Sequence, residues 1–293
     1  DGDCSLREAA QAAKTDLGVD ACQAGSGADI ITFSVGGTVI LSSSIVIESE
    51  MTIDGSGQSL TISGNDAVQI FQVYGTLSLN LLTITDGYWP GSGGAIANHT
   101  ALTITNSTLS GNCAGHNGGA IYNYRGATLT IANSIFSGNS AQVYGGAIDN
   151  DGTVTISNST FAENEVEDEN GDGGAIRNTF DTSARMTILN STLSGNGAPG
   201  SGGGIFNGNF LHLSNTIIAN STSGGDCYHL GIPLAGDNNL IEDGGFFCLP
   251  DFIGDPVLGP LQDNGGPTHT MALLPSSPAI DAGDDAVCAV APV

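Results

Sequence analysis

The stretch GGAIDNDGTVTISNSTFAEN, residues 145–164, recurs through the middle of the chain in related forms. Residues 118–139 read GGAIYNYRGATLTIANSIFSGN, and shorter copies read GGAIAN, GGAIRN and GGGIFN. A period of this length is typical of a solenoid, in which each copy forms one coil of a continuous stack. The spacings between the first glycines are 25, 27, 28 and 29 residues, for Gly93, Gly118, Gly145, Gly173 and Gly202.

Apolar and polar residues alternate inside each copy, as in TLTIAN (Leu129, Ile131) and TVTISN (Val154, Ile156). Such alternation indicates strands with one buried face. Each period offers three short strands, GGAIxN, xLTIxNS and TLSGN or IFSGN, and no segment suited to a crossover helix. A leucine-rich repeat needs a different motif, and a propeller blade needs about 40 residues or more. The sequence therefore predicts an all-β fold, a right-handed parallel β-helix.

Asparagine closes two strands in every copy. Asparagine tolerates the left-handed backbone region and bonds nearby backbone, so it suits a bend between strands. Stacked at one corner of successive coils, these side chains can also bond one another as a ladder, and we interpret them as structural. The first set is Asn98, Asn123, Asn150, Asn178 and Asn207, and the second set is Asn106, Asn133, Asn158, Asn190 and Asn215.

The two ends of a β-helix expose unpaired strand edges and need a cover. Ser5 and Glu8 have capping-box spacing before an alanine-rich run, which predicts a short helix at the start. After Ile217 the period decays and prolines accumulate, which favours an irregular closing region. We therefore predict one continuous domain with an N-terminal cap at 1–30, coils at 31–222 and a closing region at 223–293.

The composition excludes several classes of function. The chain of 293 residues carries 30 acidic and 5 basic side chains, a formal net charge of −25. This charge repels phosphate backbones and anionic lipids, so we expect neither nucleic-acid binding nor contact with a membrane surface. No run of about 18 apolar residues appears, so we expect no insertion into a bilayer. We expect an extracellular or cell-surface protein from which a signal peptide has been removed.

The cysteines indicate disulfides rather than a metal centre, because they show no CxxC spacing. Cys4 with Cys22 and Cys227 with Cys248 form two local pairs, which would place the protein in an oxidising compartment. Reduced, buried thiols in the cytosol are the alternative. Cys113 and Cys288 remain, and they pair with each other, with another chain or with nothing.

Both ends carry a family resemblance as well. The segment CSLREA at 4–9, the GGAI repeats and DNGGPTHTMALLPSSPAIDAG at 263–283 resemble secreted bacterial β-helix repeat proteins of the CSLREA-motif, choice-of-anchor type. The pairing of GGAI with FSGN at 136–139 and FAEN at 161–164 is similar to the GGAI/FxxN repeats of chlamydial polymorphic outer-membrane proteins, which are surface adhesins. The resemblance implies secretion and, in the first group, a further cysteine-containing stretch that would supply a partner for Cys288.

An enzyme that degrades polysaccharides is the alternative, since many β-helix proteins are lyases or glycoside hydrolases. Lyases of acidic polysaccharides need arginine or lysine near the substrate, and this chain has few. Asp149, Asp151 and Asp172 could lie on neighbouring coils at the separation of an inverting hydrolase. The motifs of polygalacturonases, an NTD strand, a DD pair, GHG and RIK, are missing, and the five histidines are scattered. We therefore assign no catalytic residue.

A possible calcium site lies in EVEDENGDGG, residues 165–174. Asp168, Asn170 and Asp172 alternate before Gly173, as in the first half of a calcium-binding loop. The closing acid is absent, because the twelfth position is Thr179. A solvated acidic loop is the alternative, and apart from a structural calcium ion we expect no cofactor.

The sequence thus predicts a rigid rod with a structural or adhesive role outside the cell. In one form it is an adhesin or sheath element that binds surface glycans or proteins. In the other form it stacks end to end with copies of itself into a filament, because an open coil offers backbone donors and acceptors to another coil.

Overall fold

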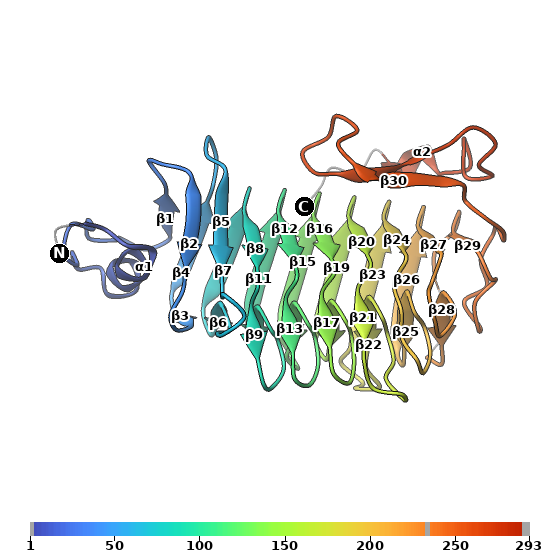
Figure 1. Cartoon of the computed structure of the whole chain (residues 1–293), viewed down its shortest axis with the longest axis horizontal. Helices are drawn as coiled ribbons and strands as arrows, with labels where there is room; N and C mark the ends of the chain where they lie inside the picture. The colour runs from blue at the N-terminus through green and yellow to red at the C-terminus, as the bar shows by residue number, and fades with distance from the viewer. Residues whose placement is uncertain (1–2, 232–234, 289–293) are drawn as a thin grey trace.

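The chain folds into a parallel β-solenoid of about eight turns. The computed structural model describes residues 3–231 and 235–288. Figure 1 shows the coils side by side along the long axis, with the helix α1 (Leu6–Thr15) at one end. The predicted all-β parallel β-helix with a short N-terminal helix is confirmed.

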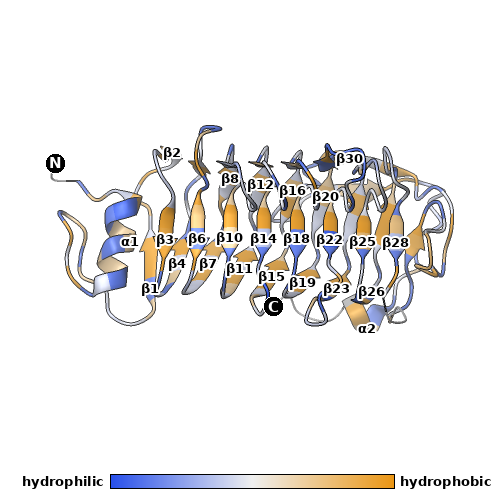
Figure 2. Ribbon diagram, turned by 90° about the horizontal axis from the view of Figure 1, so that it is seen from below, coloured by the Kyte–Doolittle hydropathy of each residue, from blue (hydrophilic) through white to orange (hydrophobic). Residues whose placement is uncertain are grey.

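The repeated GGAI motif forms one wall of the solenoid, called here the GGAI sheet. Its strands are three residues long and pair in parallel with the coils before and after them. In Figure 2 this wall faces the viewer, with apolar strand centres. Its strands are β3 (Ile45–Ile47), β6 (Phe71–Val73), β10 (Ile96–Asn98), β14 (Ile121–Asn123), β18 (Ile148–Asn150), β22 (Ile176–Asn178), β25 (Ile205–Asn207) and β28 (Cys227–His229).

The alternating LTI motif forms the second wall, the LTI sheet. Its apolar residues point into the solenoid, and the hydroxyl-bearing residues between them point outward. Its strands are β1 (Asp29–Thr32), β4 (Glu50–Asp54), β7 (Thr76–Asn80), β11 (Ala101–Thr105), β15 (Thr128–Ala132), β19 (Thr153–Ser157), β23 (Arg185–Leu189) and β26 (Phe210–Ser214).

The SGN motif forms the third wall, the SGN sheet. This is the longest ladder of the described residues, with nine strands. Its strands are β2 (Gly37–Ile40), β5 (Leu60–Ser63), β8 (Thr83–Thr85), β12 (Thr108–Ser110), β16 (Ile135–Ser137), β20 (Thr160–Ala162), β24 (Thr192–Ser194), β27 (Ile217–Ala219) and β29 (Leu240–Ile241).

A fourth, short sheet connects the SGN sheet to the next GGAI strand. The chain passes very close to its neighbours here, which explains the paired glycines. A Cβ on Gly146 would lie 2.1 Å from the carbonyl oxygen of Gly174, and Gly145 has a φ of 63°. Only glycine, which has no Cβ, suits both the close approach at Gly146 and the positive φ at Gly145. The strands are β9 (Tyr88–Trp89), β13 (Cys113–Ala114), β17 (Ser140–Ala141) and β21 (Glu165–Val166).

The core is a single apolar column inside the coils. Identical inward positions stack from coil to coil, and Ile104, Ile131 and Ile156 are fully buried at one of them. Phe136 and Phe161 stack with their ring centroids 4.8 Å apart. Because every coil covers the column of the next one, burial along the stack stabilises the whole rod rather than separate modules.

The N-terminal end is covered by α1, as the capping box predicts. The Ser5 side chain accepts from the backbone of Glu8, and the Glu8 carboxylate accepts from the Ser5 backbone. The helix packs against the first coils, and Arg7 donates to the carbonyl of Ser44 at 2.9 Å. The edge that β1 would expose is thus partly covered. No helix of the described residues is long and apolar enough to cross a membrane.

Solenoid pairing continues past the predicted boundary at residue 222. Strands β28 and β29 extend two walls, and single bridges join Tyr228 to Phe246 and Leu240 to Phe252. Parallel pairing uses backbone groups alone, so these coils form without the repeat motif. The chain then turns back along the solenoid, so part of the segment predicted to be irregular is an ordered hairpin. Its elements are β30 (Leu258–Gln262), β31 (Thr270–Leu273) and the helix α2 (Asp285–Cys288).

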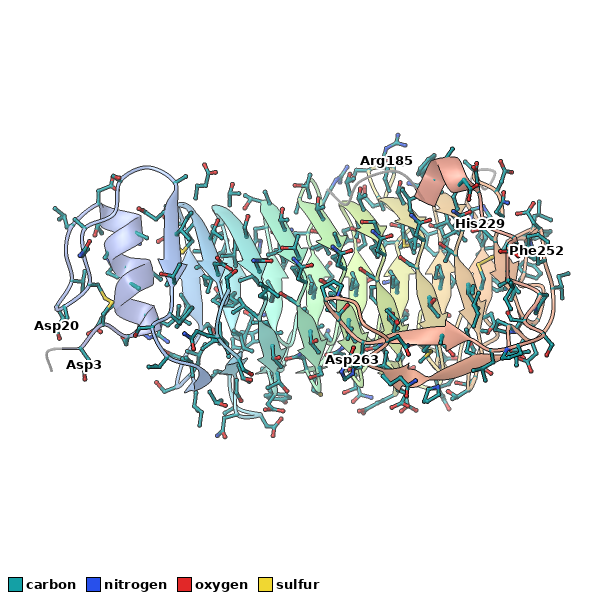
Figure 3. The ribbon with its side chains drawn as sticks, turned by 90° about the horizontal axis from the view of Figure 1, so that it is seen from above. Asp3, Asp20, Arg185, His229, Phe252 and Asp263 are labelled. Carbon is teal, nitrogen blue, oxygen red and sulfur yellow. A yellow bond between two sulfur atoms is a disulfide. The ribbon has the colours of Figure 1, made fainter. Side chains whose placement is uncertain are left out.

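The hairpin of β30 and β31 lies on the outer face of the SGN sheet. Figures 1 and 3 show it over the C-terminal half of that sheet, with its tip, near Asp263, above the middle of the rod. At the tip, Thr268 Oγ1 donates to the carbonyl of Asn133 at 3.1 Å. The N-terminal half of the outer face of the SGN sheet is left without this cover.

Candidate functional site

The first set of predicted asparagines lines the inside of the corner that follows the GGAI sheet. All five side chains are fully buried. From Asn98 to Asn178, the Nδ2 of each asparagine donates to the Oδ1 of the asparagine in the next coil at 2.6–2.7 Å. The last acceptor is Asn207. The ladder ends on His229, whose Nδ1 lies 2.7 Å from Asn207 Nδ2. These amides form hydrogen bonds with backbone carbonyls and with one another, so they stabilise the corner. They leave no polar group for a ligand.

The second set lies at the corner between the LTI and SGN sheets. All five residues have φ between 48° and 50°, the left-handed region that asparagine tolerates. Their side chains are half-buried, and the bonds between them are discontinuous: Asn133 donates to Asn106 at 3.3 Å and Asn215 to Asn190 at 3.0 Å. Backbone conformation explains these asparagines better than a ladder does.

A third asparagine ladder was missed from the sequence. Asn112, Asn139, Asn164 and Asn196 are buried, and their side chains bond in series at 2.9 Å. The signal is visible in the last letter of the repeated SGN and AEN segments.

The outward row of the GGAI sheet differs from these ladders, because its members change from coil to coil. Register places Tyr122 beside Asp149, Asp149 beside Arg177 and Arg177 beside Phe206. These side chains are the middle residues of β14, β18, β22 and β25. This row is therefore the part of the repeat where chemistry is not dictated by stacking.

An ion pair lies at the centre of that row. Arg177 Nη1 is 3.4 Å from Asp149 Oδ1, and the Arg177 guanidinium sits 3.7 Å from the ring centroid of Tyr144. Asp149 is only 1% exposed although it points away from the core. Burial raises the pKa of Asp149 to about 7, and the attraction of Arg177 only partly opposes this. Asp149 Oδ2 and Arg177 Nε have no hydrogen-bond partner among the described residues.

Aromatic rings continue this face toward the N-terminal coils. Tyr74, His99 and Tyr124 stack on one another, with ring centroids 4.3 Å and 3.9 Å apart. The Tyr122 ring meets Tyr124 edge-on, and its hydroxyl donates to Asp151. Burial lowers the pKa of His99, which therefore favours its neutral form. The signal for this stack in the sequence is a set of aromatic rings 25 residues apart.

The three carboxylates considered for hydrolysis do not share an open cleft. Asp149 is buried against Arg177, and Asp151 accepts from Tyr122. Asp172 accepts from the backbone of Ser201 at 2.9 Å, and burial raises its pKa. Inverting hydrolysis needs two carboxyl groups that flank one substrate bond. In this arrangement each carboxylate instead binds a residue of a neighbouring coil.

The predicted calcium loop follows β21. Asp168 Oδ1 accepts from the backbone of Asn170 at 2.9 Å, while Asp172 faces the next coil. Among residues 3–231 and 235–288, no three side chains of His, Cys, Asp and Glu gather as a metal site would require. The site at Asp168, Asn170 and Asp172 stays a prediction.

Four of the six cysteines form two disulfides. Cys4 is bonded to Cys22 beside α1, and Cys227 is bonded to Cys248 in the last coil. Cys113 is free and half-exposed on β13. Cys288 ends α2, but its side chain lies outside the described part of the chain. Both disulfides therefore fasten the ends of the solenoid, where coils have a neighbour on one side only.

Comparison with known proteins adds one finding. Residues 106–124 and 133–151 match the Chlamydia polymorphic membrane protein repeat. Each matched segment runs from an SGN strand through the short sheet to the next GGAI strand, and the second contains Asp149. No curated protein and no solved structure matches the chain. The similarity therefore covers parts of two successive coils of the solenoid.

Proposed function

We propose that this protein is a surface-displayed adhesive rod, secreted and exposed outside the cell, that attaches to surface glycans or proteins. The observation that carries the proposal is the match of two successive coils to a repeat of a polymorphic membrane protein family, in a chain that stacks these coils into one solenoid. We also propose that it is of the CSLREA-motif type suggested by its two ends.

The chemistry of the surface supports this role. The outward row of the LTI sheet consists of short hydroxyl side chains, such as Thr103, Thr130 and Thr155. The strong negative charge keeps copies apart and soluble. The disulfides at both ends suit an oxidising environment. A long, stiff and inert shaft places binding regions away from the surface that carries it.

The ends of the solenoid favour a separate rod over a filament. Head-to-tail stacking needs two open edges, but α1 packs over the first coil. The opposite end exposes Phe247, Leu249 and Ile253, which would meet that helix rather than a strand. Negative-stain images at increasing protein concentration test this choice. Single rods of constant length support the adhesive form, and rods that lengthen with concentration support the filament.

Location and attachment test the main proposal. Antibodies against the solenoid should label intact cells that produce it, and protease added outside should remove the label. Beads coated with the purified chain should be retained on cell monolayers and immobilised glycans more strongly than beads coated with the same chain after reduction and unfolding. Labelling only after permeabilisation, or equal retention of both bead types, would contradict the proposal.

A further inference from the structure

A cleft of about 600 Å³ lies at the point where the hairpin stops on the SGN sheet. Its floor is the outward face of β5, β8, β12 and β16. One wall is the corner loop of residues 55–59, which is longer than the equivalent corner of the next coils. The other wall is the hairpin tip, with Pro267, Thr268 and His269. Figure 3 shows this tip, near Asp263, ending over the middle of the sheet.

The size of the cleft suits a small ligand. Its volume falls within the range of about 300–1,000 Å³ that is usual for ligand sites. Its floor spans four successive strands, so it runs about 14 Å along the rod at the usual spacing of about 4.8 Å between paired strands. The bond from Thr268 to the carbonyl of Asn133 fixes the tip and therefore the length of the cleft.

The lining of the cleft carries no carboxylate, lysine or arginine, and His269 is its one titratable side chain. The chain as a whole has a net charge of −25, but none of the charged side chains lines this cleft. Without a basic group it offers no counter-charge to an anion, and without an acid it offers none to a cation. Charge therefore favours a neutral ligand.

The polar groups of the floor are available for hydrogen bonds. The hydroxyls of Thr83, Thr108 and Ser137 are half-buried and make no hydrogen bond to another described residue. A hydroxyl both donates and accepts, so these groups suit a ligand that is itself rich in hydroxyls. Between them, Leu81, Ile135 and Leu261 provide apolar surface. Rows of hydroxyls interleaved with apolar patches match the alternating edges and faces of sugar rings.

An extended peptide fits this cleft less well. Peptides that add to a sheet pair with a free strand edge. Here β5, β8, β12 and β16 are each paired on both sides, so the floor presents side chains and no free backbone. Farther along the same face, the hairpin lies over a more apolar part of the sheet, at Ile217 and Leu240.

We propose that the cleft between the corner loop and the hairpin tip is a binding site for a neutral oligosaccharide. The inference rests on the proposed adhesive function, for which it supplies a ligand class and a place on the rod. The rod then carries its ligand on the outer face of the SGN sheet, beside the corner at Asn106.

Calorimetry and ligand-observed NMR with the full chain test the site. The probes are three neutral trisaccharides, maltotriose, cellotriose and triacetylchitotriose, with trigalacturonic acid as the anionic probe. A synthetic peptide of residues 257–274 represents the hairpin of a second copy. We expect at least one neutral trisaccharide to bind, and neither the acid nor the peptide to compete with it.

A pair of matched variants locates the binding. Thr108→Trp fills the floor, whereas Thr103→Trp places the same ring on the LTI sheet of the same coil, outside the cleft. The first should weaken binding by at least about tenfold, and the second should leave it unchanged. Gln58→Ala, in the corner loop, is a second cleft variant that adds no bulk, and it should weaken binding less. Melting temperatures close to the parent show that all three fold.

The outcomes separate the cleft from the wider role. No binding of any neutral trisaccharide, binding that survives Thr108→Trp, or binding of the peptide instead would overturn the oligosaccharide site. If coated beads still attach to cells in any of these cases, the adhesive function stands and uses another surface. If beads fail to attach while the trisaccharide binds, the site stands and the adhesive function fails.

Discussion

The middle and last residues of each GGAI strand are neighbours in the chain, yet they follow opposite rules. The last residue is asparagine in β10, β14, β18, β22 and β25, always buried and always bonded to its copies. The middle residues point outward and differ: Ala97, Tyr122, Asp149, Arg177 and Phe206. Repetition marks the positions that stacking dictates, and variation marks the positions that are open to function.

Removing one rung of the ladder should have the largest effect. In Asn150→Ala, the Oδ1 of Asn178 and the amide of Gly152 lose buried partners. We expect the free energy of unfolding to fall by about 3–5 kcal/mol in urea titrations. Thr130→Ala, on the outward row of the LTI sheet, should change it by less than about 0.5 kcal/mol. Equal costs would show that the two kinds of position do not differ.

Asp149 should make stability depend on pH. Its folded pKa, about 7, lies above its ordinary value of 3.8, so the folded state binds its proton more tightly. Stability from this group is complete below about pH 4 and is lost as pH rises to about 7, at about 1.4 kcal/mol per pH unit at most. Because the amide does not titrate, the stability of Asp149→Asn relative to the parent should rise between pH 4 and pH 8, by up to about 4 kcal/mol.

Urea unfolding of both proteins from pH 4 to pH 8 measures this dependence. Asp151→Asn is the control, because it removes one carboxylate of the same coil with equal change in net charge. A parallel pH dependence of Asp149→Asn and the parent would show that the buried carboxyl titrates at its ordinary pKa.

Replacing glycine by alanine should lower the free energy of unfolding more beside the short sheet, at Gly146, than in an outer turn, at Gly138. In Gly146→Ala the new Cβ meets backbone atoms of Gly174 and Glu165, so we expect a loss of about 2–3 kcal/mol. Gly138 has a φ of 59°, and a Cβ there meets nothing within 4 Å. Gly138→Ala should cost only about 1 kcal/mol, the backbone strain alone. Thermal melts of the two variants give the comparison.

The aromatic stack should contribute least. A double-mutant cycle with His99→Ala and Tyr124→Ala should give a coupling of about 1 kcal/mol, as expected for stacked rings beyond their burial. The measurement is urea unfolding at pH 8, where His99 is neutral because burial lowers its pKa. No coupling would mean that the rings are neighbours without attraction.

The solenoid could be predicted because its period repeats the same physical requirements. Gly145 and Asn150 occupy positions where backbone approach and corner geometry leave few alternatives. The outward cluster could not be predicted, because Asp149 and Arg177 are 28 residues apart and only the register of the coils brings them together. The regular pairing of the last coils could not be predicted either, because backbone pairing at Tyr228 and Phe246 requires no repeated side-chain pattern.

The hairpin contact between Thr268 and Asn133 spans 135 residues, whereas neighbouring coils contact across about one period. Coils can thus assemble in succession as the chain emerges, each on the one before it, with short loops to close. The hairpin cannot dock until the coil of Asn133 has formed, and its residues are synthesised after those of the coils. Its docking therefore follows the assembly of these coils, and the cleft forms only then.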